Sequence, residues 1–279
     1  MELHLILLGS GQDGGSPQLG PSGATVPRTA SSVALVSDQW PPILFDASPD
    51  LRSQYNDLLR SDRDDAGRSP FGAVFITHGH MGHYAGLVHF GKEAANTSSV
   101  PLYGDDTFLD FVGHNEPWAS LVTNGNIAPR TVPAEGVEFG RVAVTAIPVP
   151  HRADFTATNA YSVTVDGSPW ALYVPDIDAW IDWPDAEEVV GAHDLCLLDA
   201  TFGSMDELPG RSIAEIPHPL VDDTLTRFAG HTVDTTIVLT HINHSNELSD
   251  PDSNLSARAN NAGFIVGSDG MTFRYGGRA

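Results

Sequence analysis

The sequence predicts an α/β protein in which helices pack on mixed β-sheets. Short apolar runs rich in β-branched and aromatic residues recur along the 279 residues, and most have turn residues at their ends. Helical patterns lie between some of these runs, while others follow one another as hairpin-like pairs. This irregular alternation is typical of helices packed on mixed sheets.

Nine runs have the pattern of strands. In chain order they are Leu3–Leu8, Ser32–Val36, Ile43–Phe45, Ala73–Ile76, Val142–Ile147, Tyr161–Val165, Trp170–Val174, Leu195–Leu198 and Thr236–Leu239. Helical periodicity is found in five segments, namely Pro49–Leu59, His83–Phe90, Ala186–Val190, Leu220–Phe228 and Asp252–Asn261. The charged segment Ser61–Arg68 is predicted to be a surface loop. Since the chain has no repeat and no linker composition, we expect one domain over residues 1–279.

The composition excludes several classes of partner. Thirty-six acidic against 14 basic residues give a net charge of −22, and Lys92 is the only lysine. Such a field repels phosphate backbones and anionic lipid, so we expect neither nucleic acid nor membrane as a partner, but a small-molecule substrate. The first residues lack a secretory signal, and no apolar run approaches the length of a membrane span, so a cytoplasmic location is expected.

Cys196 is the only cysteine. A single cysteine excludes an internal disulfide, a cysteine-based zinc knuckle and an iron–sulfur cluster. Its neighbours form the strand-like run Leu195–Leu198, in which a thiol serves as a small apolar side chain. Cys196 is therefore predicted to be a core residue and not a nucleophile.

Three histidines, His78, His80 and His83, are crowded between an apolar run and a helical segment. Histidines two apart at the end of a strand can point into one loop cavity, and a third just inside the following helix can face them. Imidazole nitrogen is a ligand for zinc, iron, copper or nickel. The alternative, a solvated polar loop, does not suit a position between a buried strand and a helix. The cluster therefore predicts a metal site.

Three later strand-like runs also end in side chains of metal-ligand type. They are His151 after Val142–Ile147, Asp176 with Asp178 after Trp170–Val174, and His241 with His244 and Asn246 after Thr236–Leu239. Sites at strand ends recur in α/β proteins. Taken singly, each residue is more often a cap or turn residue. Their order after the histidine cluster favours one metal centre.

This pattern resembles the metallo-β-lactamase-fold hydrolases. That family has a His-x-His-x-Asp-His loop, then a histidine, a bridging aspartate and a last histidine, each at a strand end. The resemblance implies that the metal ligands are His78, His80, His83, His151, Asp176 and His241. It also implies that Asp46, after an early strand, supports the loop from behind, and that the fold is an αββα sandwich of two mixed sheets with helices outside.

The chain is similar in particular to the branch that contains the pyrroloquinoline-quinone biosynthesis proteins. The shared segments are Leu8–Gly11 running into Gly14–Gln18, Ala47–Asp50, Leu198–Phe202, Thr240–Asn243 and Asp269–Met271. Two departures from the pattern stand out. The cysteine cluster that holds a structural zinc in that branch is missing after Gln18, and Gly82 stands where the wider family has the loop aspartate.

The resemblance implies two candidate activities. His78, His80 and His151 make one site, His83 and His241 make a second, and Asp176 bridges them. With one or two zinc ions per chain, the centre is that of a hydrolase that uses metal-activated water on a small ester, lactone, amide or phosphodiester. With iron, or manganese, the depleted second site of Asp176, His83 and His241 suits a non-haem oxygenase or hydroxylase in cofactor or natural-product biosynthesis.

Seven further residues have open roles. Asp13 follows the first strand in a loop that lies near the metals in this fold, so it either replaces the missing carboxylate, directly or through water, or caps a glycine turn. Asp178 and His244 either orient ligands or serve as turn residues, as does Asn246. Trp118, Trp180 and Trp183 wall a pocket or belong to the core. A homodimer is common for such a fold, although no segment demonstrates it.

Overall fold

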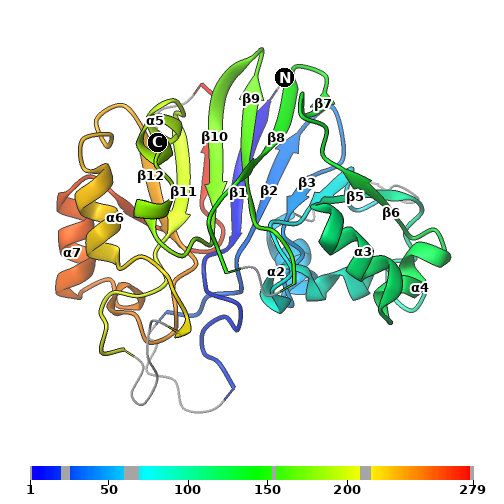
Figure 1. The fold of residues 1–279 in the computed structure, drawn as a ribbon, viewed down its shortest axis with the longest axis horizontal. Coiled ribbons are helices and arrows are strands. Elements are labelled where there is room, and N and C mark those ends of the chain that lie inside the picture. Colours follow the sequence, from blue (N-terminus) through cyan, green and yellow to red (C-terminus); the bar gives the residue numbers. More distant parts are fainter. Residues whose placement is uncertain (1, 20–25, 60–68, 153–154, 208–214, 277–279) are drawn as a thin grey trace.

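Two mixed β-sheets form the centre of the computed structural model, which describes residues 2–19, 26–59, 69–152, 155–207 and 215–276 (Figure 1). The first sheet has, in spatial order, β14 (Thr272–Arg274), β1 (Leu3–Gly9), β2 (Ser32–Ser37), β3 (Ile43–Phe45), β4 (Ala73–Phe75), β5 (Val100–Gly104) and β6 (Ile127–Thr131). Pairing is antiparallel from β14 to β3 and parallel from β3 to β6.

The second sheet is also divided into a parallel and an antiparallel part. Its order is β13 (Ile265–Val266), β12 (Thr236–Thr240), β11 (Leu195–Asp199), β10 (Ser168–Val174), β9 (Asn159–Val165), β8 (Val142–Pro148) and β7 (Val137–Phe139). Pairing is parallel from β13 to β10 and antiparallel from β10 to β7. All nine strands predicted from the sequence are found, each within two residues of its expected bounds.

The faces of the two sheets pack on each other. Phe45 and Phe75 of the first sheet contact Tyr161 of the second, with ring centroids 5.6 and 5.3 Å apart. Side chains alternate along each strand, so that Leu5 joins this central layer while Leu8 faces the helices. The predicted sandwich of two mixed sheets is confirmed.

Helices cover the outer faces. On the first sheet lie α1 (Leu51–Gln54) with the π-helical turn η1 (Tyr55–Leu59), α2 (Met81–Tyr84) with the 3₁₀ turn η2 (Ala85–Phe90), α3 (Asp106–His114) and α4 (Trp118–Thr123). On the second lie η3 (Trp180–Asp182), α5 (Ala186–Gly191), α6 (Val221–Phe228), η5 (Glu247–Ser249) and α7 (Asn254–Asn261). No helix in the described ranges has the length and apolarity needed to cross a bilayer.

The predicted helix His83–Phe90 begins two residues earlier, and only its first turn is α-helical. The carbonyl of His83 accepts a hydrogen bond from Ala47 N (2.8 Å), and Gly86 N donates to Ala47 O (2.9 Å). These groups therefore cannot continue the α-helical ladder, and the chain tightens into the 3₁₀ turn. A Cβ at Gly86 would lie 2.1 Å from Ser48 O, so this close approach requires glycine.

No strand or helix was predicted between residues 91 and 141, where β5, β6, β7, α3 and α4 form. Pro101 and Pro129 interrupt the strand pattern of β5 and β6, and β6 lies at a sheet edge, where a proline is tolerated. The segment Ser61–Arg68, predicted as a surface loop, lies outside the described residues.

The topology brings many loops to one edge of the sandwich. Strands β1, β3 and β4 of the first sheet run parallel to one another, as do β8, β10, β11 and β12 of the second. The loops that follow these strands, together with helix α2 for His83, carry every residue that the sequence predicted as a metal ligand. Helix α2, which follows β4, lies at this edge (Figure 1).

Candidate metal centre

Asp46 holds the histidine loop in place, as the resemblance implies. It is fully buried directly after β3, and its Oδ1 accepts a hydrogen bond from Thr77 N (2.8 Å). Its Oδ2 lies 2.8 Å from His83 Nδ1 and accepts from Tyr173 OH (3.2 Å). Because a carboxylate accepts, His83 Nδ1 carries the proton and Nε2 is left for another partner.

The structure brings His78, His80, His151 and Asp176 into one group. His78 Nε2 lies 2.7 Å from His80 Nδ1 and 3.3 Å from Asp176 Oδ2, and His151 Nε2 lies 3.3 Å from His80 Nδ1. Ligand atoms bound about 2.1 Å from a tetrahedral ion lie about 3.4 Å apart. These separations suit one metal ion.

A second group consists of Asp13, His83 and His241. Asp13 Oδ1 lies 3.2 Å from His83 Nε2 and 3.6 Å from His241 Nε2. Asp176 Oδ2 lies 3.9 Å from His83 Nε2 and 3.8 Å from His241 Nε2. The same Asp176 oxygen therefore adjoins both groups, which is the geometry of a bridging carboxylate.

Both groups contain buried polar atoms that make no hydrogen bond. Buried side-chain atoms without a hydrogen bond include Asp13 Oδ1, His83 Nε2, His151 Nδ1, Asp176 Oδ1 and His241 Nε2. Burying such atoms without a partner is costly, and a metal ion would satisfy several of them together. The donor set, nitrogen and carboxylate oxygen, is that of zinc and related transition metals, so the residues present fit a metal ion.

The electrostatics favour the ligating form of His78 and Asp176. At His83, burial alone would lower the pKa, but Asp46 and Asp13 raise it well above the ordinary value. Burial, together with the nearby His83, holds the pKa of His78 well below its ordinary value, so His78 is neutral at pH 7. Burial alone would raise the pKa of Asp176, but His218, His151 and His241 outweigh it and hold that pKa well below the ordinary value. Neutral imidazole and ionised carboxylate are the forms that bind metal.

His218 and Asp199 belong to the site and were not predicted. Asp199, Asp176, His218 and His241 form a third group, in which His218 Nδ1 lies 2.8 Å from Asp199 Oδ2 and 3.3 Å from Asp176 Oδ1. Burial alone would lower the pKa of His218, but the carboxylates of Asp199 and Asp176 raise it to about 9. Asp199 ends a strand, as the other candidates do, and this signal could have found it.

The remaining predicted residues have separate positions. Asp178 Oδ1 lies 2.8 Å from His151 Nδ1, beside the first group. His244 belongs to none of the three groups and contacts Asn243 Oδ1 (3.0 Å). Asn246 Nδ2 donates to Ala200 O (2.9 Å), so this amide fixes the loop after β11.

The three tryptophans belong mainly to the packing. Trp180 and Trp183 are buried in the layer between the second sheet and its helices, and Trp180 Nε1 donates to Thr224 Oγ1 (2.8 Å). Trp118 packs on Tyr84 beside α2. The predicted role of Cys196 agrees with its surroundings, because the side chain is fully buried in β11 and burial raises the pKa of its thiol.

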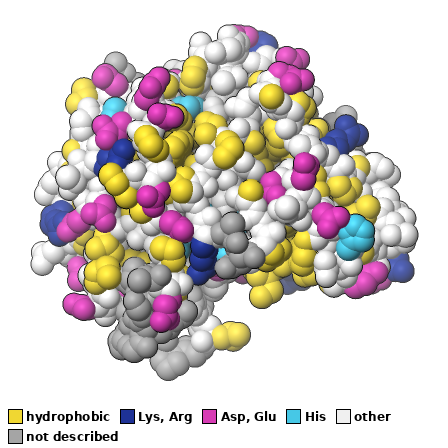
Figure 2. Space-filling view, viewed as in Figure 1, with side chains coloured by type: hydrophobic (Ala, Val, Ile, Leu, Met, Phe, Trp, Pro, Cys, Tyr) yellow, Lys and Arg dark blue, Asp and Glu magenta, His cyan; other side chains and the backbone are white. Residues whose placement is uncertain are grey.

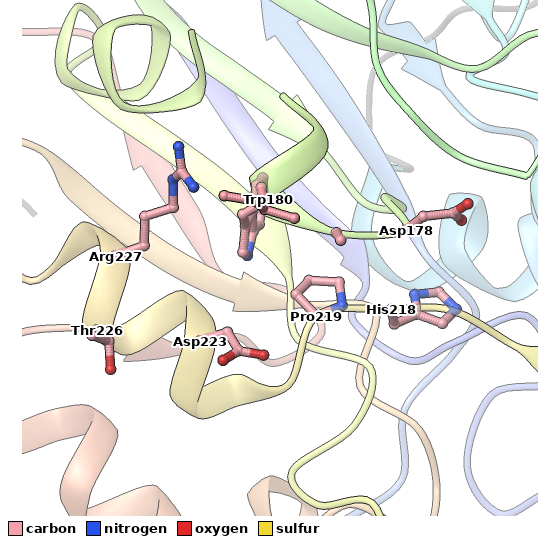
Figure 3. A pocket seen from close by; sticks show the side chains of 9 residues that line it. Asp178, Trp180, His218, Pro219, Asp223, Thr226 and Arg227 are labelled. Atoms are coloured by element: carbon pink, nitrogen blue, oxygen red, sulfur yellow. The ribbon is translucent and has the colours of Figure 1, made fainter. Parts of the chain in front are cut away.

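A cavity of about 440 Å³ adjoins the centre (Figure 3). His218 and Asp178 lie at one side of it, and Trp180, Asp223 and Arg227 lie along the rest of the wall. Since His218 also contacts Asp176, this side chain connects the cavity to the metal-ligand groups. The volume lies within the range of small-molecule sites, which is about 300–1,000 Å³.

Comparison with known proteins agrees with this geometry. The family model described as "Beta-lactamase superfamily domain" matches residues 42–242. The chain belongs to this superfamily. Within it, the chain is a homologue of coenzyme PQQ synthesis protein B. It is 30% identical to that protein from Gluconobacter oxydans, covering 98% of each chain, and 26% identical to that from Cupriavidus necator, covering 95% of this chain and 97% of the relative.

Solved structures show the same fold. Zn²⁺-bound PqqB from Methylobacterium extorquens superposes with a TM-score of 0.83 and 24% identity, over 97% of this chain and 99% of that chain. A diphosphatase of the PhnP family has a TM-score of 0.69 and 23% identity over 99% and 98% of the two chains. The short form of human tRNase Z has a TM-score of 0.60 and 18% identity over 97% and 98%.

Proposed function

We propose that this protein is a metal-dependent hydrolase that acts on a small ester, lactone, amide or phosphodiester. The observation that carries the proposal is the position of Asp176 Oδ2, which lies within 4 Å of ligand atoms from both groups. Two adjoining groups of nitrogen and carboxylate donors that share one oxygen suit a hydrolytic centre with up to two ions.

A metal ion held by His78, His80, His151 and Asp176 would act as a Lewis acid and would lower the pKa of water towards roughly 7. The chain's own residues supply orientation and a proton. Asp178 lies against the His151 ring. His218 lines the cavity with Nδ1 directed at Asp199, so it is placed to hold a proton and to give it to a leaving group.

The substrate that we propose is a small molecule. The cavity beside His218 has the size of such a ligand, and Asp178 and Asp223 are acidic residues in its wall. The basic side chains there are Arg227, whose Nε lies 3.3 Å from Glu187 Oε1, and His218, whose pKa the neighbouring carboxylates raise to about 9. This balance supports a small, weakly charged substrate over a polyanion.

Zinc is the metal that we propose, supported by the nitrogen-rich first group and by the zinc-bound relative. The test is metal analysis of protein purified without a chelating tag, followed by assays of the zinc-loaded protein on ester, lactone, amide and phosphodiester substrates. We expect about one or two zinc ions per chain and turnover that His218→Gln lowers strongly and His244→Gln leaves unchanged. Zinc-loaded protein without turnover on any of these classes would contradict the proposal.

A second candidate is a non-haem iron oxygenase or hydroxylase. Asp13, His83 and His241 form a group of two histidines and one carboxylate, the donor set of iron oxygenases. The curated relatives that act in coenzyme PQQ synthesis also support it. Reconstitution with Fe(II) under anaerobic conditions, followed by addition of oxygen and candidate substrates, tests it. Substrate-dependent oxygen uptake by the iron form, without hydrolysis by the zinc form, would favour this second candidate.

A further inference from the structure

Asp13 occupies the place that a side chain at position 82 would fill. A Cβ built on Gly82 would lie 2.2 Å from Asp13 Oδ1 and 2.7 Å from Asp13 Cβ. Both distances are shorter than any real contact of this kind, so a side chain at 82 and the present position of Asp13 exclude each other. Gly82 is the residue of the histidine loop at which the wider family has an aspartate.

The loop that carries Asp13 is fixed beside the last histidine. Gln12 N donates to Ile242 O (3.0 Å), one residue after His241, and Gly11 N donates to Thr29 O (2.9 Å). On the other side, Gly15 N donates to Gln12 O (2.6 Å) and closes the turn. Backbone hydrogen bonds on both sides of residue 13 therefore set the position of its Cα.

The carboxylate of Asp13 is directed at the second group. Its Oδ1 lies 3.2 and 3.6 Å from the free Nε2 atoms of His83 and His241. This oxygen is buried and makes no hydrogen bond, although the side chain as a whole is 34% exposed. An oxygen that capped a turn would accept from a backbone N–H, and Asp13 Oδ1 accepts from none.

We propose that Asp13 supplies, from the first loop, the carboxylate of the second metal site that the histidine loop lacks. This inference rests on the metal centre of the proposed function but not on the reaction. With glycine at position 82, the histidine loop lacks the carboxylate of the wider family and leaves open the space that Asp13 occupies. The second site therefore keeps four donors, which are Asp13, His83, His241 and the shared Asp176.

Metal content per chain, measured by mass spectrometry after loading with zinc and gel filtration, tests this inference without any activity assay. We expect about two ions in the wild type and about one in Asp13→Ala. Gln12→Ala, in the same loop, is the matched control and keeps the wild-type content. Thermal unfolding of each variant checks that the fold is retained.

The double variant Asp13→Gly/Gly82→Asp tests the exchange of places. It removes the carboxylate from the first loop and returns one to the histidine loop. Because the Cα of residue 13 lies 2.5 Å from the Cβ built on Gly82, the first loop still excludes the new side chain, so we expect the second ion not to be recovered. Gly82→Asp alone places two side chains in one space and is expected to lower the content of the second ion.

Retention of about two ions by Asp13→Ala would overturn the inference. A double variant that binds about two ions would overturn the claim that the first loop occupies the place of a side chain at position 82. If Asp13→Ala loses one ion while no ester, lactone, amide or phosphodiester is hydrolysed by the wild type, the inference stands and the proposed function fails. If the wild type hydrolyses one of these substrates while Asp13→Ala keeps the wild-type metal content, the proposed function stands and the inference fails.

Discussion

Two threonines set the ring orientation of two of the candidate ligands. Thr77 Oγ1 donates to Asp46 Oδ1 (3.0 Å), and Thr201 Oγ1 donates to Asp199 Oδ1 (2.7 Å). Because each hydroxyl donates its only proton to a carboxylate, it can only accept from the neighbouring histidine. Thr77 Oγ1 accepts from Nδ1 of His78 (3.0 Å), and Thr201 Oγ1 accepts from Nδ1 of His241 (2.8 Å). In the neutral rings the Nε2 atoms therefore carry no proton, and they face the centre.

These hydrogen bonds predict how the loss of the Thr201 hydroxyl affects zinc affinity. Thr201→Val keeps the volume of the buried side chain but leaves Nδ1 of His241 without an acceptor. We expect zinc affinity at the second site to fall roughly 10–100-fold, the usual effect of removing a partner behind a ligand. Titration against a competing chelator measures the affinity, and Thr201→Ser, which keeps the hydroxyl, is the control. Equal affinities of the Val and Ser variants would contradict the assignment.

At the scale of elements, the strands were predictable because most of them are buried in the middle of the sandwich, between the opposite sheet and the helices. A strand such as β11 is apolar at every position but its last, and this pattern is legible without a structure. The edge elements were not predicted, since β7 and β14 alternate between half-buried and exposed residues. The positions of the candidate metal ligands followed from the strand ends. His218 did not, because it precedes α6 and follows no strand, and only packing brings it to Asp176.

The position of His193 between α5 and β9 predicts that the stability of the protein depends on pH. It follows α5, and its ring joins Val189 O (Nδ1, 2.7 Å) to Ser162 Oγ of β9 (Nε2, 2.7 Å). Burial lowers the pKa of His193, so the folded state keeps it neutral while the unfolded state takes up a proton below about pH 6.5. Its contribution to stability is therefore present above that pH and is lost as the pH falls.

We expect the melting temperature of the wild type to fall between pH 7 and pH 5, and the fall to be smaller in His193→Gln. The comparison uses metal-free protein, so that metal release does not add to the slope. His114→Gln, which changes an exposed histidine on α3, should leave the slope unchanged. If the melting temperature of His193→Gln falls with pH as steeply as that of the wild type, groups other than His193 cause the pH dependence.

At the scale of the whole molecule, the surface charge predicts that this protein does not bind tRNA. Acidic side chains are spread over the face drawn in Figure 2, and arginine and lysine are few there. With a net charge of −22, association with a phosphate backbone is opposed at long range. We expect no tRNA complex in a gel-shift assay at physiological salt, with a tRNA-processing nuclease as the positive control. A shifted band that disappears with added salt would contradict this.

Metal removal is expected to lower the stability of the entire fold. A ligand that binds only the folded state at about 100 times its Kd contributes about 2.7 kcal/mol. We therefore expect the melting temperature to fall by about 5 °C or more when zinc is removed with a chelator, and to recover when zinc is returned. Asp176→Asn, which lacks the shared ligand, should respond much less to the chelator. An identical response of wild type and variant would place the stabilising ion elsewhere.

The order of the ligands along the chain has a consequence for biosynthesis. The first group is complete once Asp176 has been made, whereas the second needs both Asp13, near the start, and His241, after β12. In a growing chain the two sites therefore become available at different times, and the second waits for almost the whole protein. An ion bound there joins the first loop to one of the last, which is the role that a disulfide would have in a chain with more than its single cysteine.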